Sequence, residues 1–579
     1  MNAPDKAARL MPPMVGFELD GRPVEAFEGE SILQAAERHG VAIPRLCYMD
    51  GMRAEGNCRA CMVEIEGERV LAPSCCRSVQ PGMKVKASSE RARKSQDMVL
   101  ELLLAEMPQD GFKWLEDDAA QPHGELSQWA AKAGVNVRPT LQALTREQPA
   151  PDLSHPAMAV NLSACIQCTR CVRACREVQV NDVIGYAGRG AQARIVFDLE
   201  DPMGASSCVG CGECVQACPT GALLPSSVVR DGVRAVVPDR VVPSVCPYCG
   251  VGCQVDVHVK DDRIVEVTGR NGPANLGRLC VKGRFGFDYV RHPERLTVPL
   301  VRIDGATKDA ADADDPAAAR ARFRAASWEE ALERAAAGLR HVRDTFGPSA
   351  LAGFGSAKGS NEEAYLFQKL VRTGFGTNNV DHCTRLCHAA SVAALLEGIG
   401  SGAVTAPFTA AKDADFIMVI GANPAENHPV AATFLKDAAA RGATLAVADP
   451  RPTPLDAYAR HLLRFSPGAD VALLNALLNV VVTEGLYDRQ YVAAHTEGFE
   501  TLADHVRGFT PEAMEPVCGV PAGTVRTVAR EFAAARAALI LWGMGISQSV
   551  HGTDNARALI ALALICGQVG RRGTGLHPL

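Results

Sequence analysis

The sequence lacks the features that would place it in a membrane or on nucleic acid. No apolar run reaches the roughly 18 residues that a membrane-spanning helix needs, so we expect no membrane span. The N-terminal stretch MNAPDKAARLMPPMVGFELD has neither a hydrophobic signal core nor a twin-arginine pair, which predicts a cytoplasmic protein. The net charge of −6 gives no bulk basic field to attract nucleic acid.

Length and composition are those of a large soluble globular protein. Hydrophobic residues make up 47% of the sequence and charged residues 22%, which are ordinary values for that class. At 579 residues the chain has room for about three to five domains around substantial cores.

Cysteine is abundant, with 21 residues. Most of them fall into four spaced sets, and in a cytoplasmic chain such spacing favours metal ligation over disulfides. Four others stand apart, and we expect them to be small buried apolar residues: Cys76, Cys383, Cys518 and Cys566.

The first set follows a ferredoxin-like order of elements. Two short strands in residues 14–28 are predicted to meet in a hairpin turn at Asp20-Gly21, and Ser31 caps a helix that ends at Gly40. Two strands, a helix and a cysteine loop are the order of a plant-type ferredoxin, which favours a β-grasp [2Fe–2S] domain over 14–90. A zinc site is the alternative, and Cys76 competes with Cys75 for the fourth position. The expected ligands are Cys47, Cys58, Cys61 and Cys75.

The second and third sets repeat one pattern, C-x2-C-x2-C-x3-C, 43 residues apart. This repeat is the signature of a two-[4Fe–4S] ferredoxin domain, here predicted over 156–235, and zinc is a minor alternative. In such modules the fourth cysteine of each set ligates the other cluster. We therefore expect one cluster on Cys165, Cys168, Cys171 and Cys218, and the other on Cys208, Cys211, Cys214 and Cys175.

The fourth set has a different spacing and a long gap before its last member. On spacing alone it is compatible with a zinc site as well as with a [4Fe–4S] cluster. We assign it to a domain over 240–300, with the ligands Cys246, Cys249, Cys253 and Cys280.

Beyond an Ala/Asp-rich stretch at 305–323, expected to be an exposed linker, the pattern changes. Ser327 and Glu330 form a capping box that opens a helix. Continuous apolar strands then alternate with amphipathic helices over 325–579, which predicts a doubly wound α/β region. Ligands of such folds bind beyond the carboxyl ends of the strands.

Several phrases in the second half resemble one family. CPYCGVGC with LCVKGRFG, followed by NNVDHCTRLCHAASV, VIGANPAENHPV, VADPRPTPLDAYA, LWGMGISQSVHG and GQVGRRGTGLHPL, are similar to the molybdopterin oxidoreductase (DMSO reductase) family. With the ferredoxin-like start, the resemblance spans nearly the whole chain. Within the family it is greatest to the α (catalytic) subunit of cytoplasmic NAD-dependent formate dehydrogenases, through the phrase TRLCH.

The resemblance implies an active site. Cys387 would be the protein ligand to molybdenum or tungsten, and His388 the adjacent acid–base group. Lys282 would lie between the fourth cluster and the pterin. The dinucleotide tails of the pterin would contact residues at strand ends: Asn423, Glu426, Asp449, Arg451, Gly543, Gly545 and Gln548.

The resemblance also implies the reaction and the partners. Formate would be oxidised to CO2 at a molybdenum or tungsten bis(molybdopterin guanine dinucleotide), and electrons would pass through three [4Fe–4S] clusters and one [2Fe–2S] cluster. No G-x-G-x-x-G fingerprint of suitable context is present, so NAD reduction implies a flavin- and NAD-binding β subunit, with a γ subunit as a further option.

Two other functions compete with this one. The first is a non-catalytic electron-transfer scaffold similar to the large iron–sulfur subunit of respiratory complex I, although a scaffold has no use for Cys387, His388 and Lys282. The second is nitrate reduction on the same fold, which the phrase R-L-C-H disfavours.

The sequence departs from the family pattern in two places. Many relatives carry a His-plus-three-Cys cluster after the [2Fe–2S] domain, whereas the helical connector at 91–155 has His123 and no cysteine, so we expect that cluster to be absent. Formate dehydrogenases also continue beyond GLHPL with an R-G-Q-N-N segment that supplies the formate-binding arginine. We therefore expect either a C-terminally truncated form or a second polypeptide, and no formate turnover by this chain alone.

Overall fold

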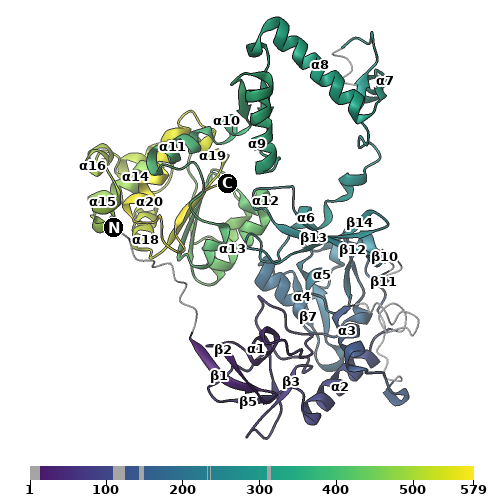
Figure 1. Cartoon of the computed structure of the whole chain (residues 1–579). Helices are drawn as coiled ribbons and strands as arrows, with labels where there is room; N and C mark the ends of the chain where they lie inside the picture. The colour runs from purple at the N-terminus through teal and green to yellow at the C-terminus, as the bar shows by residue number, and fades with distance from the viewer. Residues whose placement is uncertain (1–12, 109–123, 142–148, 231–232, 235, 309–314) are drawn as a thin grey trace. The chain divides into compact units, whose positions relative to one another are not determined.

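The computed structural model describes residues 13–108, 124–141, 149–230, 233–234, 236–308 and 315–579 (Figure 1). The N-terminal stretch, His123 and the middle of the 305–323 linker lie outside the described residues. The chain divides into two compact units, one of Met1–Cys246 with Gly252–Gly286, the other of Pro247–Val251 with Phe287–Leu579. Among the helices of the described ranges, none has the length and apolar character needed to cross a bilayer.

The first unit begins with a five-stranded sheet of order β2-β1-β5-β3-β4. The predicted hairpin is confirmed: Asp20 and Gly21 have φ of 48° and 81°, as the tight turns of hairpins require. The predicted start of α1 is confirmed as well, because the Ser31 side chain accepts a hydrogen bond from the backbone N–H of Gln34. The bounds are β1 Met14–Leu19, β2 Arg22–Phe27, α1 Ile32–Arg38, β3 Met62–Ile65, β4 Ala72–Pro73 and β5 Lys84–Lys86.

A helical connector follows, with α2 at Glu90–Ala105 and α3 at Gly124–Ala133. The buried Gln96 amide of α2 donates to the carbonyl oxygens of Met62 at 2.8 Å and Ala87 at 3.3 Å. These bonds satisfy a buried polar group and fasten α2 to the sheet.

The internal duplication is visible in the backbone of the next part. Thr169 precedes α4 with φ of 61°, and Gly212, 43 residues later, precedes α5 with φ of 70°. Strand β6 pairs with β9, and β7 with β8. The bounds are β6 Met158–Val160, α4 Arg170–Arg173, a π-helical turn Ala174–Gln179, β7 Ile184–Ala187, β8 Arg194–Phe197, α5 Glu213–Ala217 and β9 Leu223–Pro225.

A three-stranded antiparallel sheet completes the first unit. The Gln216 side chain of α5 bonds to the backbone of Gly269 and Gly277, so this sheet is attached to the duplicated part. The bounds are β12 Arg240–Val245, β13 Gln254–Lys260, β14 Arg263–Gly269 and α6 Val281–Phe285.

The second unit contains five parallel strands in the order β21-β20-β19-β22-β23. Since β19 is first in the chain, the order reverses between β19 and β22, as in a doubly wound sheet. The bounds of the strands and of the helices between them are α11 Ala389–Ile399, β19 Phe416–Ile420, α12 Pro424–Asn427, α13 Pro429–Ala440, β20 Thr444–Ala448, β21 His461–Leu463, α14 Asp470–Thr483, α15 Arg489–His495, α16 Phe499–Val506, α17 Pro511–Cys518, α18 Ala522–Ala534, β22 Ala538–Trp542, α19 Met544–Ser547, α20 Gly552–Ile565 and β23 Gly575–Pro578.

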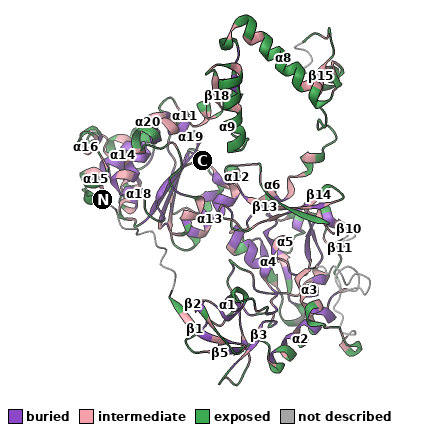
Figure 2. Ribbon diagram, in the orientation of Figure 1, coloured by how far each residue is buried: buried purple, intermediate pink, exposed green. Residues whose placement is uncertain are grey.

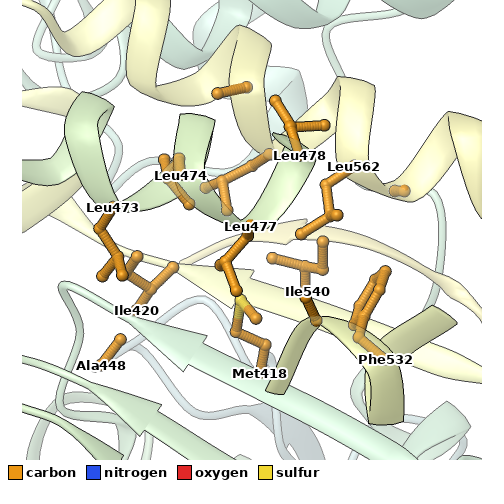
Figure 3. Packing of buried hydrophobic residues seen from close by; sticks show 14 of the residues in the cluster. Met418, Ile420, Ala448, Leu473, Leu474, Leu477, Leu478, Phe532, Ile540 and Leu562 are labelled. Atoms are coloured by element: carbon orange, nitrogen blue, oxygen red, sulfur yellow. The ribbon is translucent and has the colours of Figure 1, made fainter. Parts of the chain in front are cut away.

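The core of this unit forms where α14, α18 and α20 cover one face of the sheet. Figure 3 shows Leu473 of α14 directed at Ile420 of β19, and Leu477 of α14 directed at Met418 of β19. All residues of β19 and β22 are buried. Central strands covered on both faces explain why these segments are continuously apolar in the sequence.

The segment before β19 differs from the expected continuous alternation. Strand β17, Gly353–Gly355, pairs with β18, Val380–His382, in a separate two-stranded sheet. Helices α8, Trp328–Phe346, and α9, Asn361–Lys369, have no buried residue, although α8 begins after Ser327 as predicted. Figure 2 shows both helices as mainly exposed. The doubly wound sheet is therefore confined to residues 416–578.

Candidate active site and cluster sites

The first cysteine set converges on one place in the β-grasp part. The backbone N–H groups of Cys47 and Cys58 point at each other's sulfur atoms, at 3.4 and 3.5 Å. The thiols of Cys58 and Cys75 hydrogen-bond that of Cys47 and lower its pKa, and the thiol of Cys75 does the same for Cys61. Cys76 Sγ lies 3.5 Å from Cys75 Sγ, but Cys76 is exposed.

The second site is a small apolar cavity beside α4. Its lining includes cysteines from both repeats: Cys165, Cys168, Cys171 and Cys218. Burial raises the pKa of Cys168 to about 12, and it raises the pKa of Cys171 well above its usual range. The backbone N–H of Gln167 donates to Cys165 Sγ at 3.4 Å. The structure thus brings Cys218 to the first repeat, in the crossover arrangement.

The third site gathers the complementary set. Burial and the neighbouring thiols raise the pKa of Cys214 well above its usual range, and those thiols include Cys211, Cys208 and Cys175. Backbone N–H groups reach two of the sulfur atoms, Gly210 to Cys208 at 3.3 Å and Val183 to Cys175 at 3.3 Å. Such N–H···S bonds stabilise a thiolate more than a thiol.

The fourth set is divided between the two units. Cys246 donates its backbone N–H to the carbonyl of Cys253 at 2.8 Å, and Cys280 immediately precedes α6. Cys249 falls in the segment Pro247–Val251, which belongs to the second unit.

Cys387 and His388 occupy the end of α10, Thr384–Cys387, and the residue after it. Burial, followed by the nearby Cys383, raises the pKa of Cys387. Burial lowers the pKa of His388, although its hydrogen bond to the Leu579 carbonyl acts in the opposite direction. An imidazole with a lowered pKa is neutral at neutral pH.

A buried hydrogen-bond chain orients His388. The Trp542 indole N–H donates to Ser391 Oγ at 2.8 Å, and Ser391 Oγ lies 2.5 Å from Ser547 Oγ. Ser547 Oγ is 3.1 Å from His388 Nδ1, and His388 Nε2 is 2.7 Å from the Leu579 carbonyl oxygen. Since that carbonyl only accepts, Nε2 carries the proton and Nδ1 accepts from Ser547. Sequence reasoning missed Ser391 and Ser547, because isolated serines carry no motif signal.

The predicted pterin contacts lie at the carboxyl edge of the sheet, near the point where the strand order reverses. Asn423 follows β19, Asp449 and Arg451 follow β20, and Gly543, Gly545 and Gln548 follow β22. Asn423 Oδ1 is buried without a hydrogen-bond partner. The backbone N–H of Arg451 donates to Asp449 Oδ1 at 2.9 Å. Glu426 lies in α12 and is exposed.

One contact joins this edge to the segment of Cys387. The Gln548 amide donates to the carbonyl of Leu386 at 2.9 Å, and His388 reaches Ser547 two positions after Gly545. Lys282 is an exposed residue of α6, in the first unit.

Two expectations about isolated cysteines are wrong. Cys76 and Cys383 are exposed, whereas Cys518 and Cys566 are buried as predicted. Cys76 lies on the outer side of the turn that follows β4, and Cys383 immediately precedes the four-residue helix α10. Neither position is covered by its unit's apolar core.

Within the described ranges, no group of three or more His, Cys, Asp or Glu side chains is arranged to hold a single metal ion.

Four family models match successive parts of the chain. The molybdopterin oxidoreductase family matches residues 295–579, and its Fe4S4 domain matches 239–292. A 2Fe-2S iron-sulfur cluster binding domain matches 13–90, and the ferredoxin-like domain of NADH-quinone oxidoreductase subunit 3 matches 155–224.

Individual relatives are similar over different extents. "Formate dehydrogenase H" of Escherichia coli is 37% identical over 59% of this chain and 46% of its own length. "Probable oxidoreductase YjgC" of Bacillus subtilis is 30% identical over 97% of this chain and 58% of its own length. Acetylene hydratase from Pelobacter acetylenicus superposes with a TM-score of 0.51 at 25% identity, over 57% of this chain and 44% of that one. This chain thus spans about half of the length of the curated relatives that it matches.

From the N-terminus, a 2Fe-2S domain and a ferredoxin-like iron–sulfur domain precede the two family domains. The chain therefore carries the Fe4S4 and molybdopterin domains of the molybdopterin oxidoreductase family, and its homologues are formate dehydrogenases and related oxidoreductases.

Proposed function

We propose that this chain is the catalytic subunit of an NAD-linked formate dehydrogenase. It would oxidise formate to CO2, and the two electrons would leave through its clusters to a flavin- and NAD-binding partner subunit. The observation that carries the proposal is the position of Cys387 and His388. The residues on either side of Cys387, Leu386 and His388, contact Gln548 and Ser547 after β22, at the carboxyl edge of the sheet where doubly wound folds bind their ligands.

The cysteine geometry supports cluster binding. We propose a [2Fe–2S] cluster on Cys47, Cys58, Cys61 and Cys75, and three [4Fe–4S] clusters on the crossed sets and on Cys246, Cys249, Cys253 and Cys280. Burial raises the pKa of thiols such as Cys168 and Cys211, so without iron these sulfur atoms keep their protons. Iron would displace those protons, and the buried thiolates would then be stabilised by bonds to the metal.

The sheet edge supports a nucleotide-tailed cofactor. The buried Asn423 Oδ1 has an unmet hydrogen-bonding capacity, which a ribose hydroxyl or a base N–H would satisfy. Asp449 is suited to accept ribose hydroxyls at a strand end, and the exposed Arg451 to bind phosphate. We assign Glu426, Gly543, Gly545 and Gln548 to the same pair of dinucleotide tails.

The active-site residues have separate tasks. A molybdenum or tungsten pterin, when bound, would supply the two-electron acceptor, and the thiolate of Cys387 would be its protein ligand. His388 is neutral at neutral pH and can take up the proton released from formate at Nδ1, where Ser547 now donates. The Ser547 hydroxyl can then turn to accept from that nitrogen, so the imidazolium keeps a partner.

Lys282 and the domain organisation are proposals of the same kind. Lys282 follows Cys280 by two residues, and we propose from the family resemblance that its ammonium bonds the pterin on the electron path. We also propose that the chain is organised in five parts, at residues 14–90, 91–155, 156–235, 240–300 and 325–579. The partner would accept electrons near the [2Fe–2S] domain.

Replacing Cys387 tests the function. In the assembled, anaerobically purified enzyme, Cys387→Ala should abolish formate-dependent NAD reduction and leave the cluster iron unchanged, because it removes only the ligand of the heavier metal. Cys383→Ala is the matched control, since Cys383 is an exposed neighbouring cysteine, and it should retain activity.

Metal analysis on the same samples decides between the enzyme and the scaffold. Molybdenum or tungsten with iron in the unaltered protein supports the proposal. Turnover that persists in Cys387→Ala, or abundant iron with neither heavier metal in the full assembly, would contradict it.

A further inference from the structure

Two buried arginines connect the cluster-binding parts of the first unit. Each donates hydrogen bonds to a backbone carbonyl of a cysteine in one set and also contacts the segment that carries the next set. We infer that Arg173 and Arg284 are positioning residues for electron transfer, holding successive clusters at a set spacing. This inference rests on the proposed clusters, but not on formate as the substrate.

Arg173 joins the [2Fe–2S] set to the second set. Its side chain is 3% exposed, and one terminal nitrogen donates to the carbonyls of Cys47 at 2.5 Å and Cys168 at 3.2 Å. Its other terminal nitrogen donates to the carbonyl of Arg53 at 2.6 Å. One guanidinium nitrogen therefore bridges two cysteines that are 121 positions apart, each from a different set.

A carboxylate balances the Arg173 charge. Glu55 Oε2 lies 3.4 Å from Arg173 Nε and accepts the hydroxyl of Thr169 at 2.6 Å. Partial burial acts to raise the pKa of Glu55, but the Thr169 hydrogen bond and the charge of Arg173 lower it overall. The carboxylate therefore stays ionised at neutral pH and pairs with the guanidinium.

The neighbouring Arg170 strengthens the same junction. It is buried on α4, one turn before Arg173, and donates to the carbonyl of Leu46 at 3.2 Å and to Glu125 at 2.8 Å. Leu46 directly precedes the cluster cysteine Cys47. Helix α4, which begins one residue before Cys171, thus carries two cations into the backbone of the [2Fe–2S] loop.

Arg284 performs the corresponding task at the other junction. It lies on α6, four residues after Cys280, and its side chain is 2% exposed. Its Nε donates to the carbonyl of Cys211 at 2.7 Å, and its terminal nitrogens donate to Gln216 and Glu213, each at 2.7 Å. Glu213 also accepts the backbone N–H of Leu279 at 2.7 Å.

The glycine at position 212 shows how closely this junction is packed. A Cβ on Gly212 would lie 2.3 Å from Arg284 Cδ and 2.8 Å from its Nε. The guanidinium therefore passes directly over the turn between Cys211 and Cys214, so movement of α6 would be transmitted to the third set.

These contacts imply the order in which the clusters follow one another in the first unit. The [2Fe–2S] centre adjoins the cluster of Cys165, Cys168, Cys171 and Cys218, and the cluster of Cys208, Cys211, Cys214 and Cys175 adjoins the segment of Cys280. Burying a charge is costly and gives little stability by itself. A planar guanidinium, however, can donate to several carbonyls in a fixed geometry, which a lysine ammonium does not do.

A redox titration followed by electron paramagnetic resonance tests Arg173 in the full-length holoprotein, without formate. Removing a buried positive charge disfavours the reduced state of nearby clusters. Arg173→Met should therefore retain all iron but shift the [2Fe–2S] midpoint potential to a more negative value. It should also alter the magnetic interaction between the reduced [2Fe–2S] centre and its neighbour.

Two further variants separate charge from position. Arg173→Lys should leave the [2Fe–2S] midpoint potential close to that of the unaltered protein, because the positive charge stays. It should still alter the magnetic interaction between the two clusters, because the hydrogen bonds that bridge Cys47 and Cys168 are lost. Arg176→Gln is the control, since Arg176 lies on the next turn and is exposed beside Asp182, and it should match the unaltered protein. If Arg173→Met lowers the iron content, the magnetic interaction in Arg173→Lys alone decides whether Arg173 has the positioning role.

The result distinguishes this inference from the proposed function. Arg173 variants that contain iron and match Arg176→Gln in both potential and magnetic interaction would overturn the positioning role, while formate turnover would still stand on Cys387. Altered interactions in a protein without formate activity would support the positioning role and leave the substrate assignment wrong.

Discussion

At the scale of single residues, His388 shows how a buried chain selects one protonation state. Trp542 can only donate, so each hydroxyl after it accepts from one neighbour and donates to the next until the chain ends at Nδ1. Trp542 and Ser391 are fully buried, so water does not compete for the bond between them. The serines therefore hold the imidazole in one orientation and one tautomer.

Replacing Ser547 should disturb that state. In the unaltered enzyme the pKa of His388 is lowered, so activity that needs the neutral imidazole is lost only as pH falls below about 6.5. Ser547→Ala removes the donor that favours the neutral form. The acid limb of kcat/KM should therefore move to higher pH, with a rate loss of about tenfold, as expected for one hydrogen bond.

The measurement is the pH profile of formate oxidation by the assembled enzyme. Ser401→Ala is the control, because Ser401 is an exposed loop residue whose hydroxyl accepts only from the nearby Ala403 N–H among its described bonds. An acid limb in Ser547→Ala that coincides with that of the control would show that the serine chain does not set the state of His388.

At the scale of elements, the loops after β19 and β22 approach too closely for side chains. Gly421 has φ of 57°, and a Cβ there would lie 2.9 Å from the backbone nitrogen of Ile546. A Cβ on Gly545 would lie 2.7 Å from the Gly421 carbonyl oxygen. These contacts bring the two loops together where the strand order reverses, so the candidate binding edge depends on glycine.

Gly421→Ala should therefore separate the loops. Both the positive φ and the backbone contact oppose a methyl group, and we expect a loss of about 1–3 kcal/mol in unfolding free energy, with a lower molybdenum or tungsten content. Thermal unfolding and metal analysis measure the two effects. Gly508→Ala, where a Cβ meets nothing within 4 Å, should change neither, and equal behaviour of the two variants would rule out the close approach as a constraint.

At the scale of the whole molecule, the chain combines a unit that carries iron–sulfur domains with a unit that carries the molybdopterin domain. The duplicated ferredoxin part lies at the centre of the first unit in sequence, with contacts to the β-grasp part through α4 and to the sheet of β12–β14 through α5. We expect each of its two clusters to take one cysteine from the other repeat, because the apolar cavity beside α4 is lined by cysteines of both repeats.

Single substitutions can test this exchange of cysteines between the two repeats. If Cys218 serves the first repeat, Cys218→Ala should remove the same electron paramagnetic resonance signal as Cys165→Ala, with iron lost from one cluster only. Cys208→Ala should remove the other signal. A Cys218→Ala spectrum that matches Cys208→Ala would show that each repeat binds its own cluster without exchange.

Local patterns could be interpreted from the sequence because short-range chemistry determines them. The hairpin at Asp20-Gly21, the cap at Ser31 and the helix start at Ser327 depend on neighbouring residues, and all three are confirmed. The apolar strands β19, β20 and β22 were evident because both faces of a central strand are buried. The exposed state of α8 was not evident, because an amphipathic pattern does not show what covers its apolar face.

The sequence by itself determined the cysteine spacing, the order of the motifs along the chain and the adjacency of Cys387 and His388, since each is a property of contiguous residues. Only the tertiary structure decided that serines 391 and 547 orient His388, and that Arg173 bridges Cys47 and Cys168. Apart from the bond to Cys168, these contacts join residues 126 to 159 positions apart, and a lone serine or arginine carries no local pattern that names its distant partner.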